Sequence, residues 1–366
     1  MDLTEILRDA TEMIGCESPS ADLAAVARSA DVVAAVGARR LGSEPERIVL
    51  DGRTHLRWRV GAGPSRVLLL GHHDTVWPLG SLTTHPCTVE GGVLRGPGCF
   101  DMKAGLAMAF HAAAGLDGVT VLVTGDEELG SPSSRALIED EARAAEAALV
   151  LEASAAGGAL KTERKGVSLY EVAVKGRAAH AGLEPERGVN ATLELAHQAL
   201  VVARLGDPAA GTTVTPTAAR AGTTSNTVPA EGACAVDVRV RTAAEQARVD
   251  RAMRGLAPVL DGALVEVTGG PNRPPLDAAS SADLFARLCR SADRLDLPEP
   301  TSAAVGGASD GNFTAGVGTP TLDGLGAVGG GAHADDEHVL VEELPDRTAL
   351  LRALVVDLLA GPGGRP

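Results

Sequence analysis

The sequence predicts an α/β protein in which a mostly parallel sheet domain carries a smaller, inserted ferredoxin-like α+β domain. Three observations predict this. The chain has 366 residues, whereas a single hydrophobic core usually stops growing at about 250–300 residues. In the first half of the chain, short aliphatic runs alternate with helical stretches. Near residue 168 the pattern changes to the order β-α-β-β-α-β, which is typical of a ferredoxin-like unit.

The aliphatic runs of the first half predict buried strands at 67–70, 119–123 and 148–151. Helical patterns between these runs predict helices at 101–116 and 133–147. Strands that alternate with helices in this way favour a mostly parallel sheet.

The middle of the chain has a different pattern. Residues 167–176 alternate between apolar and polar side chains, as in a half-buried strand, and the following stretches predict a helix, two strands, a second helix and a final strand. Patterns like those of the first half resume after the Pro-rich segment 269–277. We therefore expect one domain made of residues 1–167 and 277–366, interrupted by a second domain at 168–276.

Acidic and histidine residues follow three of the predicted strands directly. His72 and Asp74 follow the first strand, Glu127 and Glu128 the second, and Glu152 the third. The carboxyl ends of parallel strands meet at one edge of a sheet, and ligands of α/β proteins bind there. We therefore expect these side chains to gather at that edge.

Imidazole and carboxylate groups are the ligands that divalent metals take from proteins when thiolates are absent. The five cysteines are scattered and form no Cys-x-x-Cys pair, which excludes a structural thiolate zinc site. Two imidazoles and three carboxylates suit two cations that share a bridging carboxylate, and such paired metals lie about 3.5–4 Å apart. The candidate ligands are His72, Asp101, Glu128, Glu152 and His333.

Two further carboxylates have candidate roles beside these ligands. Glu127 precedes Glu128 and is a candidate general base, a role that contributes about 10²–10⁴-fold to the rate. Asp74 lies two residues beyond His72 and is a candidate acceptor for the second ring N–H of that histidine. Such a bond would fix the tautomer of the ligand.

Five segments of the sequence resemble the metal-site segments of one known family. They are GHHDTV, GPGCFDMKAG, TGDEELGS, LVLEAS and GGGAHADDEHV, in the order that the family has. The family is that of the co-catalytic zinc metallopeptidases, which includes carboxypeptidase G (glutamate carboxypeptidase), succinyl-diaminopimelate desuccinylase and acetylornithine deacetylase. The stretch GHHDTVWPLGSL, followed by GPGCFDMKAG, resembles the carboxypeptidase G branch most.

The resemblance implies how the ligands are shared between two metal ions. Asp101 would bridge both ions, and the peptide bond that follows it would be cis. His72 and Glu152 would complete one ion, and Glu128 and His333 the other. The expected ions are two Zn²⁺, with Co²⁺ and Mn²⁺ as alternatives because these ligands accept all three.

The resemblance extends to the inserted domain, which implies a lid and dimerisation domain and a homodimer. GRAAHAGLEPERGVNA resembles a lid segment, which implies that His180 reaches the active site of a partner subunit and donates to the oxyanion. AGTTSNTVPAEGACAVDVRVR resembles the segment that carries an asparagine and an arginine. Asn226 would then also reach across the dimer, and Arg239 would bind the free carboxylate of the substrate.

The stretch GGASDGNF resembles the Gly-rich carboxylate loop of the family, which implies that Gly307 and Ser309 contact the substrate. Ala308 stands where relatives have Thr or Gly, so no side-chain hydroxyl is present at that position. Ser309 is a candidate to supply a hydroxyl instead.

The implied activity is release of a C-terminal amino acid, with glutamate as the first candidate, from a peptidyl or N-acyl substrate. The alternative is an N-acyl-amino-acid deacylase of the acetyl or succinyl type. A catalytically inactive metal-binding scaffold would be expected to lack Glu127 or a ligand, and none is missing. The loops typical of two-metal phosphoesterases are not apparent.

Composition limits the partners. The formal net charge is −15, and an acidic surface repels nucleic acid and anionic membranes. No apolar run approaches the roughly 20 residues needed to span a bilayer, and the N-terminal stretch lacks the pattern of a signal peptide. We therefore expect a cytoplasmic protein that acts on a small peptide or N-acyl amino acid and binds neither nucleic acid nor membrane.

Overall fold

A computed structural model describes residues 1–361 and divides into two compact units. The first, here called the sheet unit, comprises Met1–Arg164 and Leu276–Pro366, and the second, the inserted unit, comprises Lys165–Pro275. The predicted inserted domain, 168–276, begins three residues later and ends one residue later than this unit.

The central sheet of the sheet unit has the strand order β1-β2-β6-β3-β7-β16. Neighbours from β6 to β16 pair in parallel, whereas β1 and β2 pair antiparallel and form one edge. The mainly parallel sheet predicted from the sequence is therefore confirmed. The strands are β1 (Glu46–Leu50), β2 (Arg53–Val60), β6 (Val119–Thr124), β3 (Val67–His72), β7 (Ala147–Val150) and β16 (Thr321–Leu322).

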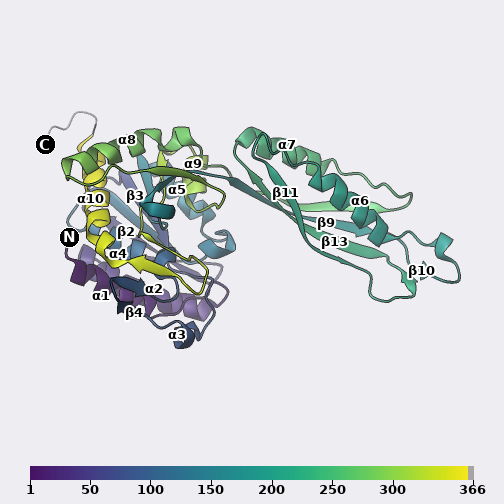
Figure 1. Ribbon diagram of the computed structural model, residues 1–366, viewed down its shortest axis with the longest axis horizontal. Helices are drawn as coiled ribbons and strands as arrows, with labels where there is room; N and C mark the ends of the chain where they lie inside the picture. Colours follow the sequence, from purple (N-terminus) through teal and green to yellow (C-terminus); the bar gives the residue numbers. More distant parts are fainter. Residues whose placement is uncertain (362–366) are drawn as a thin grey trace. The chain divides into compact units, whose positions relative to one another are not determined.

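Helices cover both faces of this sheet (Figure 1). Val67 and Leu69 of β3 join the larger core, and Leu68 and Leu70 join the core on the opposite face. Because both faces are buried, the strand is continuously apolar instead of alternating. The larger core includes α1 (Leu3–Ile14), α2 (Leu23–Leu41), α4 (Ala104–Ala113), α8 (Ala278–Arg294) and α10 (Leu344–Ala360), and the other includes α5 (Arg135–Ala144) and α9 (Gly311–Gly316).

Smaller sheets lie beside the central one in the same unit. One has the order β17-β18-β5-β4, and the other pairs β15 with β8 in parallel. These short strands did not show in the hydrophobic pattern, because they offer few residues to either core. Their bounds are β4 (Thr88–Glu90), β5 (Val93–Arg95), β17 (Gly329–Gly330), β18 (His338–Leu340), β8 (Leu160–Arg164) and β15 (Ser302–Val305).

The inserted unit has the order β-α-β-β-α-β along the chain. Its antiparallel sheet runs β11-β13-β9-β14. Side chains of β9 alternate between buried and more exposed positions, and Tyr170, Val172 and Val174 are buried in cores to which both helices contribute. The helices α6 and α7 lie along this sheet (Figure 1). The elements are β9 (Gly166–Lys175), α6 (Ala191–Ala203), β11 (Thr213–Ala221), β13 (Glu231–Val240), α7 (Ala243–Arg254) and β14 (Leu264–Arg273), with β10 (Ala179–His180) and β12 (Thr227–Val228) pairing separately.

Within residues 1–361, every helix is too short or too polar to cross a bilayer.

A buried carboxylate joins the helices α1, α2 and α4. Asp9 is fully buried and accepts hydrogen bonds from Arg39 at 2.9 Å, from His111 at 2.9 Å and from Arg40. Burial alone would raise the pKa of Asp9, but Arg40, Arg39 and His111 outweigh it and lower the pKa to about 2. The charged carboxylate is therefore a stabilising group of the fold.

Asp9→Asn is expected to lower the free energy of unfolding by about 2 kcal/mol at pH 7. The folded pKa lies below the unfolded value, so this contribution is present above about pH 4 and is lost as the pH falls through about 2. Urea unfolding at pH 7 and pH 3 would measure it. Glu12→Gln, which removes the half-exposed partner of Arg39, is the control and should cost far less. An Asn variant equally destabilised at both pH values would contradict the linkage.

Candidate metal centre

Three of the predicted site segments lie at the carboxyl ends of neighbouring parallel strands. His72 is the last residue of β3, Glu152 follows β7 by two residues, and Glu127 and Glu128 open a 3-10 turn, Glu127–Leu129, just after β6. The order β6-β3-β7 places these ends side by side. The structure thus brings together the side chains that were expected to meet because each follows a predicted parallel strand.

Asp101 and His333 come from irregular segments. Asp101 lies in the irregular turn Cys99–Lys103 that leads into α4, and the Asp101–Met102 peptide bond is cis, as the resemblance implies. Gly105 lets α4 begin close to the end of β7, because an added Cβ there would stand 2.2 Å from the carbonyl oxygen of Leu151. His333, half-exposed, lies between β17 and β18.

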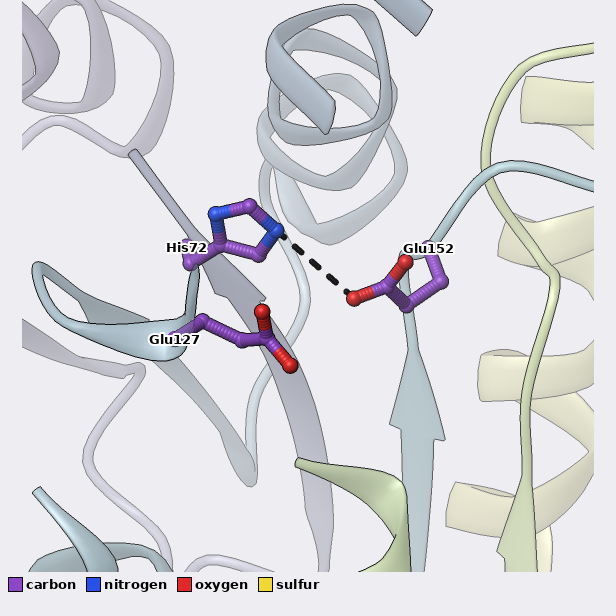
Figure 2. A group of neighbouring side chains, drawn as sticks. All are labelled: His72, Glu127 and Glu152. Atoms are coloured by element: carbon purple, nitrogen blue, oxygen red, sulfur yellow. Dashed lines mark ion pairs between the residues drawn. The ribbon is translucent and has the colours of Figure 1, made fainter. Parts of the chain in front are cut away.

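The two carboxylate oxygens of Asp101 face different histidines. Oδ1 lies 3.3 Å from Nε2 of His72, which is also 3.6 Å from Oε1 of Glu152 (Figure 2). Oδ2 lies 3.1 Å from Nε2 of His333, which is 3.2 Å from Oε1 of Glu128. The side chains therefore form two groups that share Asp101, in the same pairing that the resemblance implies.

The ring of His72 has a defined tautomer in its neutral form. Its Nδ1 lies 2.9 Å from the backbone carbonyl oxygen of Asp74. A carbonyl can only accept, so Nδ1 carries a proton and the Nε2 lone pair faces the carboxylates. Oδ1 of Asp74 is farther away, at 3.5 Å. The predicted acceptor residue is thus in place, but its nearest acceptor atom is the main-chain oxygen.

The chemistry of these groups fits divalent cations. Within residues 1–361, His72 Nε2, Asp101 Oδ1 and Glu128 Oε1 are buried atoms that make no hydrogen bond. All three belong to candidate metal ligands, and a buried polar atom without a hydrogen-bond partner is costly. The set His72, Asp101, Glu128 and the set His72, Glu127, Glu152 each bring their ligand atoms within 4.8 Å of one another. Metal ions would satisfy these atoms together.

Without a cation, the cluster favours bound protons. The carboxylates of Asp101 and Glu128 raise the pKa of His333 to about 10. Burial and the charge of Asp101 raise the pKa of Glu152 to about 7. Burial lowers the pKa of His72, but Asp101 and Asp74 outweigh it, so the net shift is well upward. Metal binding must displace these protons, because ligands bind metals in their deprotonated forms.

Metal removal with a chelator is therefore expected to abolish any catalysis at this site and to lower the free energy of unfolding. The loss would be about 3 kcal/mol for metal originally present at about 100 times its Kd. Calorimetric titration of the apoprotein at pH 7, in two buffers that differ in ionisation enthalpy, should show proton release, and the affinity should fall as the pH falls. Metal binding without proton release would contradict the proposed ligand set.

Glu127 and Glu128 are held in place by Asp74. The fully buried carboxylate of Asp74 accepts the backbone N–H of Glu127 at 3.2 Å and that of Glu128 at 3.3 Å. The carboxylate of Glu127 is directed toward the space between His72 and Glu152 (Figure 2). Asp74 thus orients the turn that carries both glutamates.

The structure gives Ser309 a different role from the expected one. Ser309 is fully buried, its hydroxyl donates to Asp323, and its Oγ accepts the N–H of Gly311 at 3.1 Å. The hydroxyl is therefore committed to the protein, and this corrects the expectation that Ser309 supplies the substrate with the hydroxyl that Ala308 lacks. Gly307 is exposed, so its backbone remains a candidate for substrate contact.

Sequence reasoning did not single out Glu337. Its buried carboxylate accepts the N–H groups of Gly98 at 3.0 Å, Phe100 at 2.9 Å and Asp101 at 3.0 Å, and the indole N–H of Trp77 at 2.7 Å. It thus fixes the backbone of Asp101, the candidate bridging residue. The sequence feature that could have indicated Glu337 is its position four residues after His333, within the segment GGGAHADDEHV that resembles a metal-site segment.

His180 and Asn226 lie together in the inserted unit. β10 pairs with β12, and the N–H of Ala181 donates to the carbonyl oxygen of Asn226 at 2.9 Å. Nδ1 of His180 accepts the N–H of Gly182 at 3.1 Å, so the neutral ring carries its proton on Nε2. His180 is exposed and therefore presents an N–H donor at the surface.

Arg239 lies elsewhere in the same unit. It pairs with Val167 in the register of β13 and β9, near the point where the chain enters the unit, and its guanidinium binds Asp237 at 2.8 Å. Glu231, at the opposite end of β13, pairs with Lys175. The structure therefore does not bring Arg239 close to His180 within one inserted unit.

Comparison with known proteins agrees with this site. The model of "Peptidase family M20/M25/M40" matches residues 68–357. Carboxypeptidase G2 of a Pseudomonas species is 33% identical over 310 residues, which are 79% of this chain and 73% of the relative. A succinyl-diaminopimelate desuccinylase of Shewanella loihica is 27% identical over 315 residues, 77% of this chain and 82% of the relative.

Solved structures show the same fold. Aminopeptidase PepT of Bacillus cereus has a TM-score of 0.75 at 22% identity and covers 98% of this chain and 99% of its own. An M20 family metallo-carboxypeptidase of Sulfolobus solfataricus has a TM-score of 0.74 at 17% identity, with 97% and 99% covered. The family consists of dinuclear metal-dependent hydrolases. The match over residues 68–357 shows that this chain belongs to peptidase family M20/M25/M40, and the two groups of candidate ligands around Asp101 agree with it.

Proposed function

We propose that this protein is a two-metal exo-acting amidase that releases a C-terminal amino acid, with glutamate as the first candidate, from a peptidyl or N-acyl substrate. The observation that carries the proposal is the position of Glu127. Its carboxylate lies with His72 and Glu152, while the next residue, Glu128, faces His333. A general base beside a two-metal site suits the hydrolysis of an amide by water, because the metals would lower the pKa of the water and the base would accept its proton.

Two divalent ions, Zn²⁺ as the first candidate, held by the five ligands would supply Lewis acidity for water and for the amide carbonyl. Glu127 accepts the proton of the attacking water and passes it to the leaving amine. Asp74 keeps this carboxylate aimed by holding its backbone N–H.

In this proposal, Arg239 makes the enzyme specific for the C-terminal residue of the substrate, because it binds the free carboxylate. A guanidinium binds a carboxylate in a bidentate manner that an ammonium cannot reproduce. In this structure the guanidinium of Arg239 binds the carboxylate of Asp237, so a substrate carboxylate would have to replace Asp237 as its partner. Gly307 offers backbone for further contact with the substrate.

Arg239→Ala is expected to raise KM by about 10–100-fold, since a hydrogen-bonded charge pair contributes about 1.5–3 kcal/mol. The effect on kcat should be smaller, because the carboxylate is remote from the bond that breaks. Arg220→Ala is the control, because Arg220 also forms an ion pair with a carboxylate of this unit, Glu171, although that pair is more exposed than the pair of Arg239 with Asp237. Steady-state kinetics would check it, and an unchanged KM for the Arg239 variant would contradict the assigned contact.

We also propose that the enzyme works as a homodimer. Arg239 and Glu231 are eight residues apart on β13, about 26 Å at about 3.3 Å per residue, and His180 lies beyond Glu231. Arg239 and His180 can therefore line one small-substrate site only if they come from different copies. Exposed apolar side chains on α6, at Leu193, Leu200 and Val201, support a second copy on this unit.

In such a dimer, His180 and Asn226 would complete the site of the other copy. The proton on Nε2 of His180 suits donation to the oxygen that becomes negative as the amide carbonyl is attacked. Asn226 would add a neutral donor next to it. The second copy would therefore supply both of these donors.

The second candidate is an N-acyl-amino-acid deacylase, which the similarity to a desuccinylase favours. Both activities use the same chemistry and differ in the acyl group. The test is a panel of metal-loaded assays with N-acyl glutamates, dipeptides ending in different residues, and N-acetyl or N-succinyl basic amino acids, with the released amine measured. Preference for the last group would overturn the carboxypeptidase proposal, and hydrolysis of none would overturn both.

A further inference from the structure

Arg164 is a buried cation at the end of β8. Its side chain is 4% exposed and binds Asp323 through two hydrogen bonds, Nε to Oδ2 at 2.6 Å and Nη2 to Oδ1 at 3.2 Å. The backbone of Arg164 is also fixed, because it exchanges hydrogen bonds with Leu276 at 2.9 and 3.0 Å. Both ends of the side chain are therefore anchored.

The same guanidinium reaches two parts of the site. Nη2 lies 3.8 Å from Oε2 of Glu152, whose other oxygen faces His72 at 3.6 Å. Nη1 donates to the carbonyl oxygen of Gly307 at 3.3 Å. Glu152 thus lies between the guanidinium of Arg164 and the imidazole of His72, and the same guanidinium holds the loop around Gly307.

Asp323 connects the loop from its other side. It follows β16 directly, and its carboxylate accepts the hydroxyl of Ser309 as well as the guanidinium of Arg164. The pair thereby links Glu152, which follows β7 by two residues, with the end of β16 and the loop around Gly307. An ion pair needed for folding alone would require none of these contacts with the site.

We propose that Arg164 is a positioning residue for the reaction, which orients Glu152 as a metal ligand and fixes the backbone of the Gly307–Ser309 loop. The part that concerns the loop rests on the proposed function, since it assumes substrate contact there. The part that concerns Glu152 does not depend on which substrate is cleaved.

The test compares Arg164→Lys with Arg347→Lys. Arg347 is a matched control, because it is a partly buried arginine that also donates to backbone carbonyls, at Gly158, Gly324 and Gly326, and within residues 1–361 it forms no ion pair with a metal ligand. Both proteins are loaded with Co²⁺, and the visible absorption, the affinity for each ion and the values of KM and kcat are measured, together with Tm.

For Arg164→Lys we expect one ion to bind about 10–100-fold more weakly, a typical effect when the partner of a ligand is removed, and a changed Co²⁺ spectrum. KM should rise because the loop is loosened. For Arg347→Lys we expect a lower Tm with an unchanged spectrum and affinity. Asp323→Asn keeps the guanidinium of Arg164 but weakens the pair that holds it. We expect the same changes in metal affinity, Co²⁺ spectrum and KM as for Arg164→Lys, but smaller ones. This variant replaces Arg164→Lys in the test if the lysine variant does not fold.

A lower Tm with unaltered metal affinity, spectrum and KM in both Arg164→Lys and Asp323→Asn would overturn the proposal, because the pair would then be structural only. The metal readouts keep this outcome distinct from failure of the proposed function. If no substrate of the panel is cleaved but the Co²⁺ spectrum changes, the positioning of Glu152 stands and the substrate assignment fails.

Discussion

Glu127→Gln is expected to retain both metal ions and to lose on the order of 10³-fold or more in kcat. The amide has the shape of the carboxylate but cannot accept the proton of the attacking water. Glu127 is buried beside His72 and Glu152, so no bulk water can easily replace it as the base. KM should change little, because the substitution alters the transition state more than substrate binding. Metal analysis and steady-state kinetics on the same sample would check the retained metal content and the loss of kcat.

The adjacent residue provides the control for that experiment. Glu128→Gln is the same chemical change one position along the chain, but Oε1 of Glu128 faces His333 at 3.2 Å and makes no hydrogen bond in the described residues. We expect this variant to lose metal from the group around His333 and to lose activity for that reason. A Glu127→Gln protein with near-normal turnover, or one without metal, would show that the roles of the two glutamates are assigned wrongly.

Strand-end placement predicted part of the site from elementary rules. His72, Glu128 and Glu152 each follow an apolar run, and parallel pairing of β6, β3 and β7 brings these ends together. Asp101 and His333 could not be placed in this way, because they lie in an irregular turn and a loop. Their grouping came from the resemblance to known metal-site segments.

Contacts between distant segments had no signal in the sequence. Arg164 and Asp323 are 159 residues apart, and no periodic pattern connects them. Ser309 lies in a segment that resembles a substrate loop, yet its side chain turns inward to Asp323. The direction of a loop side chain depends on which residue the fold places next to it. A motif therefore predicts where such a residue lies in the fold better than it predicts which group its side chain contacts.

The edge of the central sheet was missed for a related reason. β1 and β2 form an antiparallel hairpin, and the exposed residues of β1 give it no buried run. Trp58 of β2 is buried and contacts Phe110 edge to face, with 5.1 Å between the ring centroids. This strand therefore contributes to the core, even though arginines alternate with its buried residues. Arg57 and Arg59 alternate with it and pair with Glu141.

A heterodimer made of one His180→Ala subunit and one Glu127→Ala subunit is expected to recover about half of the wild-type activity, although each variant alone is nearly inactive. The reason is the separation within the inserted unit, where Arg239 lies near one end of β13 and His180, on β10, lies beyond the other end of that strand. One of the two sites in the mixed dimer would then combine an intact Glu127 with an intact His180 from the other copy. Co-expression with two affinity tags, followed by sequential purification, isolates the mixed dimer for assay.

The control pairs His180→Ala with Asn226→Ala. These residues are neighbours in one inserted unit, so both sites of that mixed dimer would lack one of the two donors and no recovery is expected. If His180 served its own subunit instead, the first mixture would also stay inactive, because each site would carry one defect. Recovery in the first mixture and its absence in the second can arise only when the metal centre and His180 of one active site belong to different chains, which makes the dimer a requirement of the chemistry and not only of stability.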